Sequence, residues 1–221
     1  MVTACYDHIR YYGRFIHVIP RREHAGPADK LILLPADPRV GVDDCSDLAA
    51  CLQNIGLIGG QTAHASGLFY PTGDRFLQLV SFLGCSPSIE LDPPSNRAEL
   101  DQAVANGRFC HVVLVCEPTL RFRADRQTRP PRCPHCGRPV PDWQVHIRTW
   151  QDNPAESHWS CTACGEAGEL TDWVFRKTAG FGKVFLEIRG IYPSEAVPGE
   201  ALLAALAEHT GGTWRYMYIK E

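Results

Sequence analysis

Two pairs of cysteines carry the clearest chemistry in this sequence. Cys133 and Cys136 stand in the segment CPHCG, and Cys161 and Cys164 stand in CTACG, so each pair encloses two residues and is followed by glycine. This spacing lets two thiolates bind one ion, and two pairs complete the tetrahedral four-sulfur shell of structural Zn²⁺ sites. We therefore predict a metal centre, whose closed shell leaves no position for water or substrate.

The residues around the two pairs support this prediction. Gly137 and Gly165 allow the backbone to turn sharply and to aim its N–H groups at the thiolate sulfurs, which argues against a coincidence of buried cysteines. His135, His146 and His158 lie in or near the same segment. Because four thiolates already fill a tetrahedron, we expect these histidines to be surface or packing residues.

Residues 126–172 resemble the zinc-ribbon group, in which two such knuckles lie on hairpins and hold one zinc ion. The resemblance implies that Cys133, Cys136, Cys161 and Cys164 bind structural Zn²⁺. Rubredoxin-like iron sites use the same knuckles, so iron with electron transfer is the alternative. The segments FLGCSP and GFGKVFLEIRGIYPSEAVPGEALLAAL are similar to a group of bacterial proteins with no assigned activity, which implies no reaction.

Four further cysteines form two pairs with a spacing of six: Cys45 with Cys51, and Cys110 with Cys116. In a helix, two side chains six residues apart point in different directions. In a strand, six residues separate two side chains by roughly 20 Å. Neither pair can chelate an ion by itself, so we expect buried apolar thiols.

Catalytic signatures are missing from the sequence, which contains no G-x-S-x-G, H-E-x-x-H or phosphate-loop motif. Cys5 and His8 have ligand-type spacing without a partner pair nearby. Cys110 and His111 face opposite sides of one strand, so they cannot act as nucleophile and base. The sequence favours a non-catalytic protein, and the alternative is an enzyme that uses Cys85, His64 or His111 in its main domain.

The composition is that of a globular protein: 221 residues, 44% of them hydrophobic and 10% aromatic, with a net charge of -3. This charge argues against a globally basic nucleic-acid-binding protein. The first residues lack the apolar stretch of a secretory signal, and the longest apolar runs, 31–34 and 111–116, are too short to span a membrane. We predict a cytoplasmic protein with reduced thiols and no membrane partner.

A surface rich in arginine and tryptophan surrounds the first cysteine pair. The predicted partner-binding residues are Arg121, Arg123, Arg126, Arg129, Arg132, Trp143 and Trp150. Arginines bind phosphates and exposed tryptophans stack on bases, as in single-strand nucleic-acid binding. Acidic residues dominate 149–172, however, and guanidinium groups suit protein carboxylates equally well. We expect a protein partner first and a nucleic acid second.

Apolar periodicity gives the expected organisation. It predicts strands at 15–19, 31–34, 109–116, 183–191 and 214–218, and helices after 43, from 74 to 83, from 95 to 105 and from 199 to 209. Residues 56–67 have no clear period and read as a mobile loop. We expect an α+β or α/β fold with one mixed sheet: 1–125 begins the core, 126–172 is the inserted zinc ribbon, and 173–221 completes the core.

Overall fold

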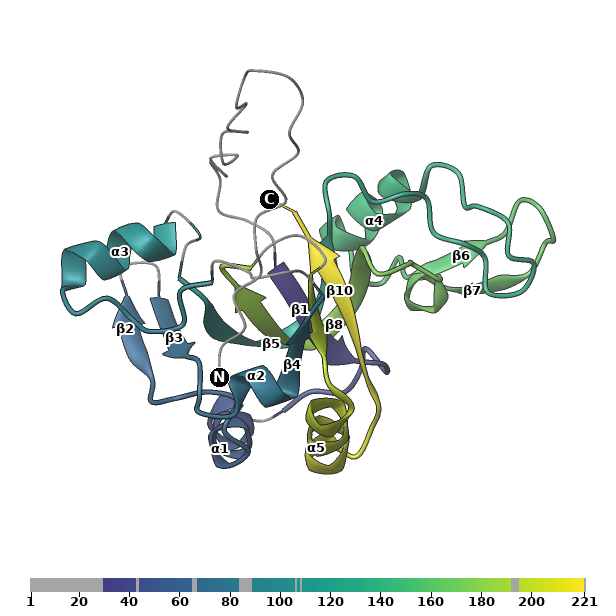
Figure 1. The fold of residues 1–221 in the computed structure, drawn as a ribbon. Coiled ribbons are helices and arrows are strands. Elements are labelled where there is room, and N and C mark those ends of the chain that lie inside the picture. The colour runs from purple at the N-terminus through teal and green to yellow at the C-terminus, as the bar shows by residue number, and fades with distance from the viewer. Residues whose placement is uncertain are drawn as a thin grey trace, which may run out of the picture.

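The main element of the fold is a curved six-stranded sheet with the strand order β10-β1-β8-β5-β3-β2 (Figure 1). The computed structural model describes residues 30–42, 44–64, 67–83, 89–105, 107, 109–191 and 195–220. The strands are β1 (Lys30–Pro35), β2 (Thr62–His64), β3 (Gly67–Pro71), β5 (His111–Ala124), β8 (Ala179–Arg189) and β10 (Trp214–Ile219). Each neighbouring pair in this sheet is antiparallel.

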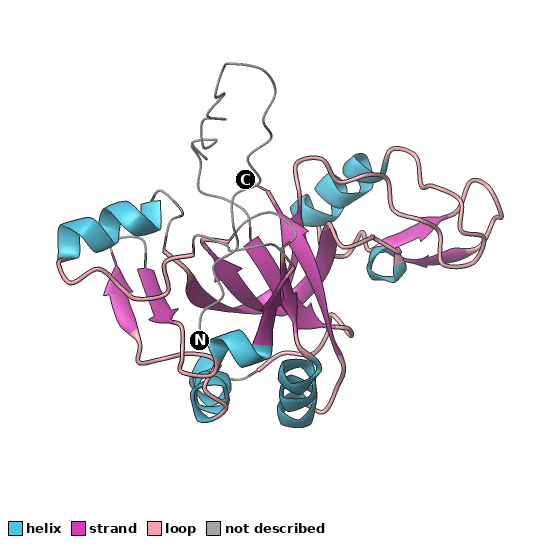
Figure 2. Ribbon diagram, in the orientation of Figure 1, coloured by secondary structure: helices cyan, strands magenta, loops and turns pink. Residues whose placement is uncertain are grey.

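Helices and two small sheets surround this large sheet (Figure 2). The helices are α1 (Cys45–Asn54), α2 (Phe76–Leu79), α3 (Arg97–Ala105), α4 (Trp143–Asp152) and α5 (Glu200–Thr210), with a 3₁₀ turn at Leu170–Asp172. Strand β4 (Val80–Phe82) pairs with β9 (Ala196–Pro198), and β6 (His158–Ser160) pairs with β7 (Ala167–Glu169). The predicted α+β class is therefore confirmed.

One face of the sheet packs against α1 and α5, which lie side by side beneath it (Figure 1). Leu48 and Leu52 of α1 and Leu202 and Leu206 of α5 are fully buried in this cluster. Alternation along β8 supplies Val184, Leu186 and Ile188 to the same cluster. We call this cluster the helix-side core; burial of its aliphatic side chains is the main driving force for this part of the fold.

Strand β8 is buried on both faces, although an alternating sequence such as that of 183–191 is typical of a half-buried strand. Phe185 is 0% exposed and Glu187 is 1% exposed on the face opposite the helices. The connection from β8 through α5 to β10 agrees with a crossover, because both strands pair antiparallel with β1 between them and therefore run parallel.

One end of the sheet curves toward its edge strand β10. Strand β5 continues past Glu117 and Pro118, where the sequence predicts its end, because a register shift between Cys116 and Arg121 absorbs the proline. Beyond this irregularity, the Lys220 N–H donates to Asp125 Oδ2 at 2.7 Å, and the Tyr218 N–H donates to the Lys177 carbonyl at 2.9 Å. The far ends of β5 and β8 thus reach the edge strand β10.

Two sequence predictions differ from the structure in the region before β5. The expected loop at 56–67 contains β2 and an isolated bridge from Ile58 to Thr72, since pairing with β3 supplies order that small residues do not signal. The expected helix at 74–83 shortens to α2, and its last residues form β4, because β9 offers them a pairing partner. The strand predicted at 15–19 lies outside the described residues.

A disulfide joins Cys45 of α1 to Cys116 of β5, with a Cα–Cα distance of 6.0 Å. This corrects the expectation that these two cysteines are reduced thiols. The bonded partners are 71 residues apart in sequence, so the spacing of six residues within each pair does not reveal them. Cys110 is a free, fully buried thiol as predicted, and Cys51 is free and partly buried.

Candidate metal centre

The first knuckle, residues 133–137, follows a short extended segment at Arg132. The Gly137 N–H donates to the Cys133 carbonyl at 2.9 Å, and the Cys133 N–H donates to the Arg138 carbonyl at 2.9 Å. Gly137 has a φ of 69°, in the left-handed region that side chains disfavour. The turn therefore requires the glycine that the sequence places there.

The second knuckle, residues 161–165, repeats this geometry in the turn between β6 and β7. The Gly165 N–H donates to the Cys161 carbonyl at 2.8 Å, the Cys161 N–H donates to the Glu166 carbonyl at 2.8 Å, and Gly165 has a φ of 78°. Two segments 28 residues apart in sequence thus adopt the same conformation. Such repetition indicates a shared task rather than chance packing.

The four cysteine sulfurs converge on one point. All four Sγ atoms lie within 4.8 Å of one another, with Cys133 3.9 Å from Cys164 and Cys136 3.8 Å from Cys161. Zinc–sulfur bonds of about 2.3 Å at tetrahedral angles require sulfur–sulfur distances of about 3.8 Å. The four cysteines therefore fit a four-coordinate ion of this kind, and the predicted set could bind a metal.

The local electrostatics also favour a cation between the sulfurs. The backbone N–H groups of Ala163 and Cys164 lower the pKa of the Cys161 thiol to about 6. The Glu166 N–H lowers the pKa of Cys164, but desolvation and the neighbouring thiols outweigh it and raise that pKa to about 12. Four thiolates this close repel one another, and a divalent ion removes the repulsion by binding all four.

An aromatic core supports the metal centre. We call residues 131–175 the cysteine module; its core contains Trp143, Trp150, Trp159 and Trp173, each no more than 7% exposed. Cys133 and Cys161 belong to the same buried cluster. The knuckles are therefore attached to packed rings, which fixes the positions of their sulfurs.

The burial of Trp143 and Trp150 changes the predicted partner-binding set. Trp143 is 6% exposed and Trp150 is 7% exposed, since both lie on the inner face of α4. Neither ring presents a face on which a base could stack. The arginines remain as the accessible members of that set.

The five predicted arginines do not form one continuous surface. Arg121 and Arg123 both pair with Glu117, at 3.2 and 3.9 Å, across the irregular part of β5. Arg132 donates to the Gly137 carbonyl at 2.8 Å and so braces the first knuckle. Arg126 and Arg129 are exposed and form no ion pair with any described residue. Among the described residues, the acidic side chains of 149–172 therefore do not pair with Arg126 or Arg129.

The module is joined to the large sheet by rings and by one ion pair. Phe181 of β8 contacts Phe122 of β5 at 4.8 Å between ring centroids and Trp150 of α4 at 5.3 Å. Arg39, in the loop after β1, pairs with Glu169 of β7 at 2.6 Å. These contacts attach the module to β5 and β8 of the large sheet.

The histidines of the module are not ligands in this arrangement. His135, His146 and His158 are exposed, as expected, and none belongs to the cluster of four sulfurs. His146 packs its ring edge-on to Trp173 at 5.8 Å. This contact identifies it as a packing residue.

Of the catalytic candidates, the structure describes the side chain of His111 alone. His111 is buried and lies 2.9 Å through Nδ1 from the Phe109 carbonyl, with its ring stacked on Phe109. Its ring lies in a cluster with Phe69 and Phe109. Cys5, His8 and Cys85, and the side chain of His64, lie outside the described residues.

Comparison with known proteins returned no matching family model, no matching curated protein and no matching solved structure. The resemblance to zinc ribbons and to a group of bacterial proteins therefore stays a prediction. The metal site is supported by the cysteine spacing and by the convergence of the four sulfurs. No helix among the described residues is long and apolar enough to cross a membrane.

Proposed function

We propose that this protein is a non-catalytic binding protein in which a structural zinc ion organises an interaction surface on the cysteine module. The observation that carries the proposal is the closed set of four converging sulfurs. A four-thiolate site leaves no coordination position for substrate, so the role of the ion is to hold the module together. In this proposal residues 126–172 are an insertion into the core built by 1–125 and 173–221.

Zinc is favoured over iron because nothing else in the described chain suits electron transfer. The cysteines are anchored in the aromatic core of the module, which suits a structural ion that holds this core together. Zinc needs no redox partner and contributes directly to the stability of a small module.

A protein partner is favoured over a nucleic acid by the distribution of charge and apolar area. Asp152, Glu156 and Glu166 are exposed on the module and would repel a phosphate backbone. Val145 and Val174 are 58% and 50% exposed on the same module, where apolar contact suits a protein surface. The buried tryptophans remove the stacking platform that a single-strand binder needs.

Metal analysis of the purified protein tests the metal assignment. We expect one zinc ion per chain and four sulfur neighbours at about 2.3 Å by X-ray absorption. The variant Cys161→Ser should lose the ion, whereas Cys51→Ser, which changes a free cysteine outside the site, should keep it. Iron with visible charge-transfer bands, or metal-free folded protein, contradicts the zinc assignment.

Site-specific photo-crosslinking in native host cells tests the partner class. A crosslinker at Val145 should capture protein, and the same group at exposed Glu208 on α5 should not give the same adduct. Adding Cys161→Ser should abolish the Val145 adduct, because the surface depends on the metal. Capture of RNA or DNA instead, with a steep salt dependence that Arg129→Ala removes, supports the nucleic-acid alternative.

A further inference from the structure

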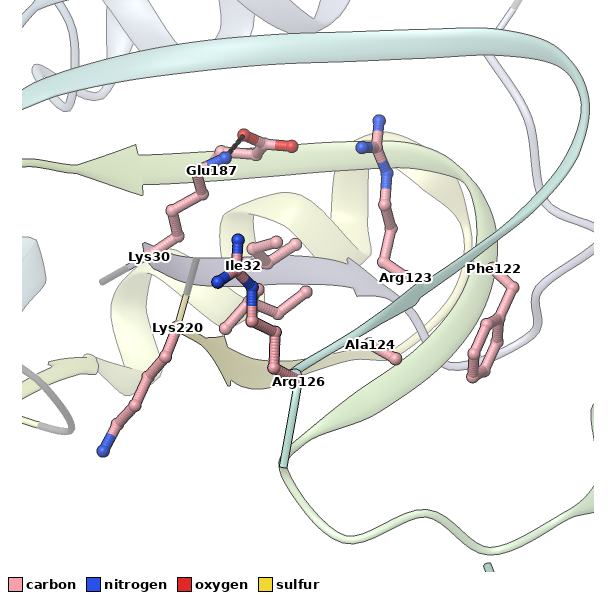
Figure 3. A pocket seen from close by; sticks show the side chains of 9 residues that line it. Lys30, Ile32, Phe122, Arg123, Ala124, Arg126, Glu187 and Lys220 are labelled. Carbon is pink, nitrogen blue, oxygen red and sulfur yellow. Dashed lines mark ion pairs between the residues drawn. The ribbon is translucent and has the colours of Figure 1, made fainter. Parts of the chain in front are cut away.

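A cavity of about 440 Å³ lies where the far end of β5 comes close to β8 and to the ends of β1 and β10, and none of the four cysteines of the metal centre lines it. Figure 3 shows the side chains that line it. Its charged lining consists of Lys30, Arg123, Arg126 and Lys220 with the single carboxylate Glu187. Ile32 and Ile219 supply apolar surface. The sequence groups Arg123 and Arg126 with the arginines of the module, whereas the structure turns them toward this separate site.

Sheet geometry brings these residues together from distant positions. Lys30 and Ile32 share one face of β1, and Ile32 lies opposite Glu187 of β8 in the register. The Asp125 carboxylate accepts from the N–H of Lys220 at 2.7 Å and from the N–H of Gln127 at 2.6 Å. This carboxylate therefore holds the segment that carries Arg126 against the end of β10.

The one lining carboxylate is already neutralised. Glu187 Oε2 accepts from Arg189 Nε at 2.9 Å and from Arg189 Nη2 at 2.5 Å, and it lies 3.8 Å from Lys30 Nζ. Its side chain is only 2% exposed, and a carboxylate this buried needs such paired cations to remain charged. Glu187 can therefore position Lys30 at the cavity and does not neutralise Arg123, Arg126 or Lys220.

The remaining charge of the site is positive. Arg123 stacks its guanidinium over Phe185 at 5.3 Å and is 3.9 Å from Glu117 Oε1, which leaves its Nε buried without a hydrogen-bond partner among the described residues. Arg126 is exposed and forms no ion pair with a described residue. Among the described residues around the cavity, with Arg189, Glu117 and Asp125 included, there are five cations and three carboxylates, an excess of two positive charges.

We propose that this cavity binds the phosphate groups of a phosphorylated small molecule of about nucleotide size. Guanidinium forks bind phosphate oxygens in pairs, and ammonium groups add point charges. The volume exceeds what one phosphate needs and falls within the range of about 300–1,000 Å³ typical of small-molecule sites. The apolar surface of Ile32 and Ile219 suits the non-phosphate part of such a ligand.

Calorimetric titration of the full-length, metal-loaded protein with pyrophosphate and with ATP tests the proposal. We expect saturable binding of both, and Arg126→Ala should weaken it at least tenfold. Arg148→Ala removes the same charge from the exposed face of α4, outside the cavity, and should change the affinity less than twofold. In ¹H–¹⁵N spectra the amides of Arg123 and Lys220 should shift on titration, and those of the knuckles should not.

Controls separate a specific site from general attraction. Arg126→Lys keeps the charge and removes the fork, so it should bind with intermediate affinity, and unchanged unfolding temperatures for both Arg126 variants should exclude a folding defect. Absence of saturable binding, or equal losses in the Arg126→Ala and Arg148→Ala variants, overturns the proposal. Binding of a single-stranded oligonucleotide without binding of ATP also overturns it, in favour of an extended nucleic-acid surface.

Discussion

The helix-side core and the cysteine module stabilise neighbouring parts of one chain by different means. The helix-side core is built largely from aliphatic side chains between two helices and a sheet, whereas the module packs four tryptophans around a four-sulfur centre. A small unit has little interior, so each buried side chain must be large and a metal ion must supplement the packing. The comparison indicates that the larger region can be stabilised by aliphatic packing, whereas the smaller one needs large aromatic rings and a metal ion.

Sulfur serves the two regions differently as well. In the helix-side core, Cys45 and Cys116 are joined covalently, and the bond links α1 to β5. In the module the sulfurs stay 3.8 Å or more apart in the two pairs of closest contact, a distance that suits coordination and not covalent bonding. The same residue type therefore acts as a crosslink in one region and as a ligand in the other.

Loss of the metal should have the largest effect and should be confined to the module. Structural zinc contributes on the order of 10 kcal/mol in small units, so Cys161→Ser should unfold residues 131–175. Hydrogen exchange should show lost protection there and retained protection in β1 and α5. Tryptophan fluorescence should shift to the red, because four of the five tryptophans lie in the module. Retained protection in the module contradicts a structural role for the ion.

Truncation of the ring of β8 that packs against the module should have the next largest effect. Phe181 is 1% exposed and contacts Phe122, Trp150 and Phe175. Phe181→Ala should lower the free energy of unfolding by about 3–5 kcal/mol, measured by urea denaturation. Val145→Ala, at an exposed position of α4, should cost less than about 0.5 kcal/mol. A small effect of Phe181→Ala shows that the ring contacts between the module and the large sheet contribute little to stability.

Removal of the disulfide should destabilise the helix-side core and spare the module. Cys45→Ala opens a loop of 71 residues in the unfolded chain, for which a loss of about 2–4 kcal/mol is typical. Urea denaturation should show this loss, with zinc content unchanged, and Cys51→Ala is the matched control on the same helix. Alkylation of both Cys45 and Cys116 in protein purified without reductant contradicts the bond.

The ion pair between the two regions should have the smallest effect. Arg39 and Glu169 are 2.6 Å apart, but their side chains are 66% and 36% exposed, so solvent screens the attraction. Arg39→Ala should cost about 0.2–1 kcal/mol, and a double-mutant cycle with Glu169→Gln should give a coupling energy in the same range. A coupling above about 2 kcal/mol means that this pair, and not the ring contacts, orients the module.

The metal centre is largely predictable from sequence because its information is local. Each knuckle contains two ligands and the glycine that its turn requires within five residues, so spacing alone identifies it. Helices α1, α3 and α5 are predictable for a similar reason: Asp44, for example, caps α1 by accepting from the Ser46 N–H at 2.8 Å, where acidic residues signal a helix start. Helix α4 is not among the predicted helices. Periodicity then places the buried side of each helix.

The cavity and the disulfide are not predictable in the same way, because each depends on strand register. Lys30 and Arg126 become neighbours only after β1 and β5 take their places in one curved sheet. Cys45 and Cys116 meet only when α1 lies across β5. Short strands such as β4 and β9 are missed because three residues carry too little periodic signal.

The position of β1 in the sheet has a consequence for the order of events during protein synthesis. Its partners are β8 and β10, so Lys30 pairs with Ile219 across nearly the whole described chain. After β1 has been synthesised, well over a hundred further residues must be added before β8 or β10 is available for pairing. Contacts between residues so distant in sequence form slowly. The two knuckles of the module are close in sequence, so the module can bind its ion before β10 has been synthesised. We expect the nascent chain to acquire metal before it acquires its central sheet.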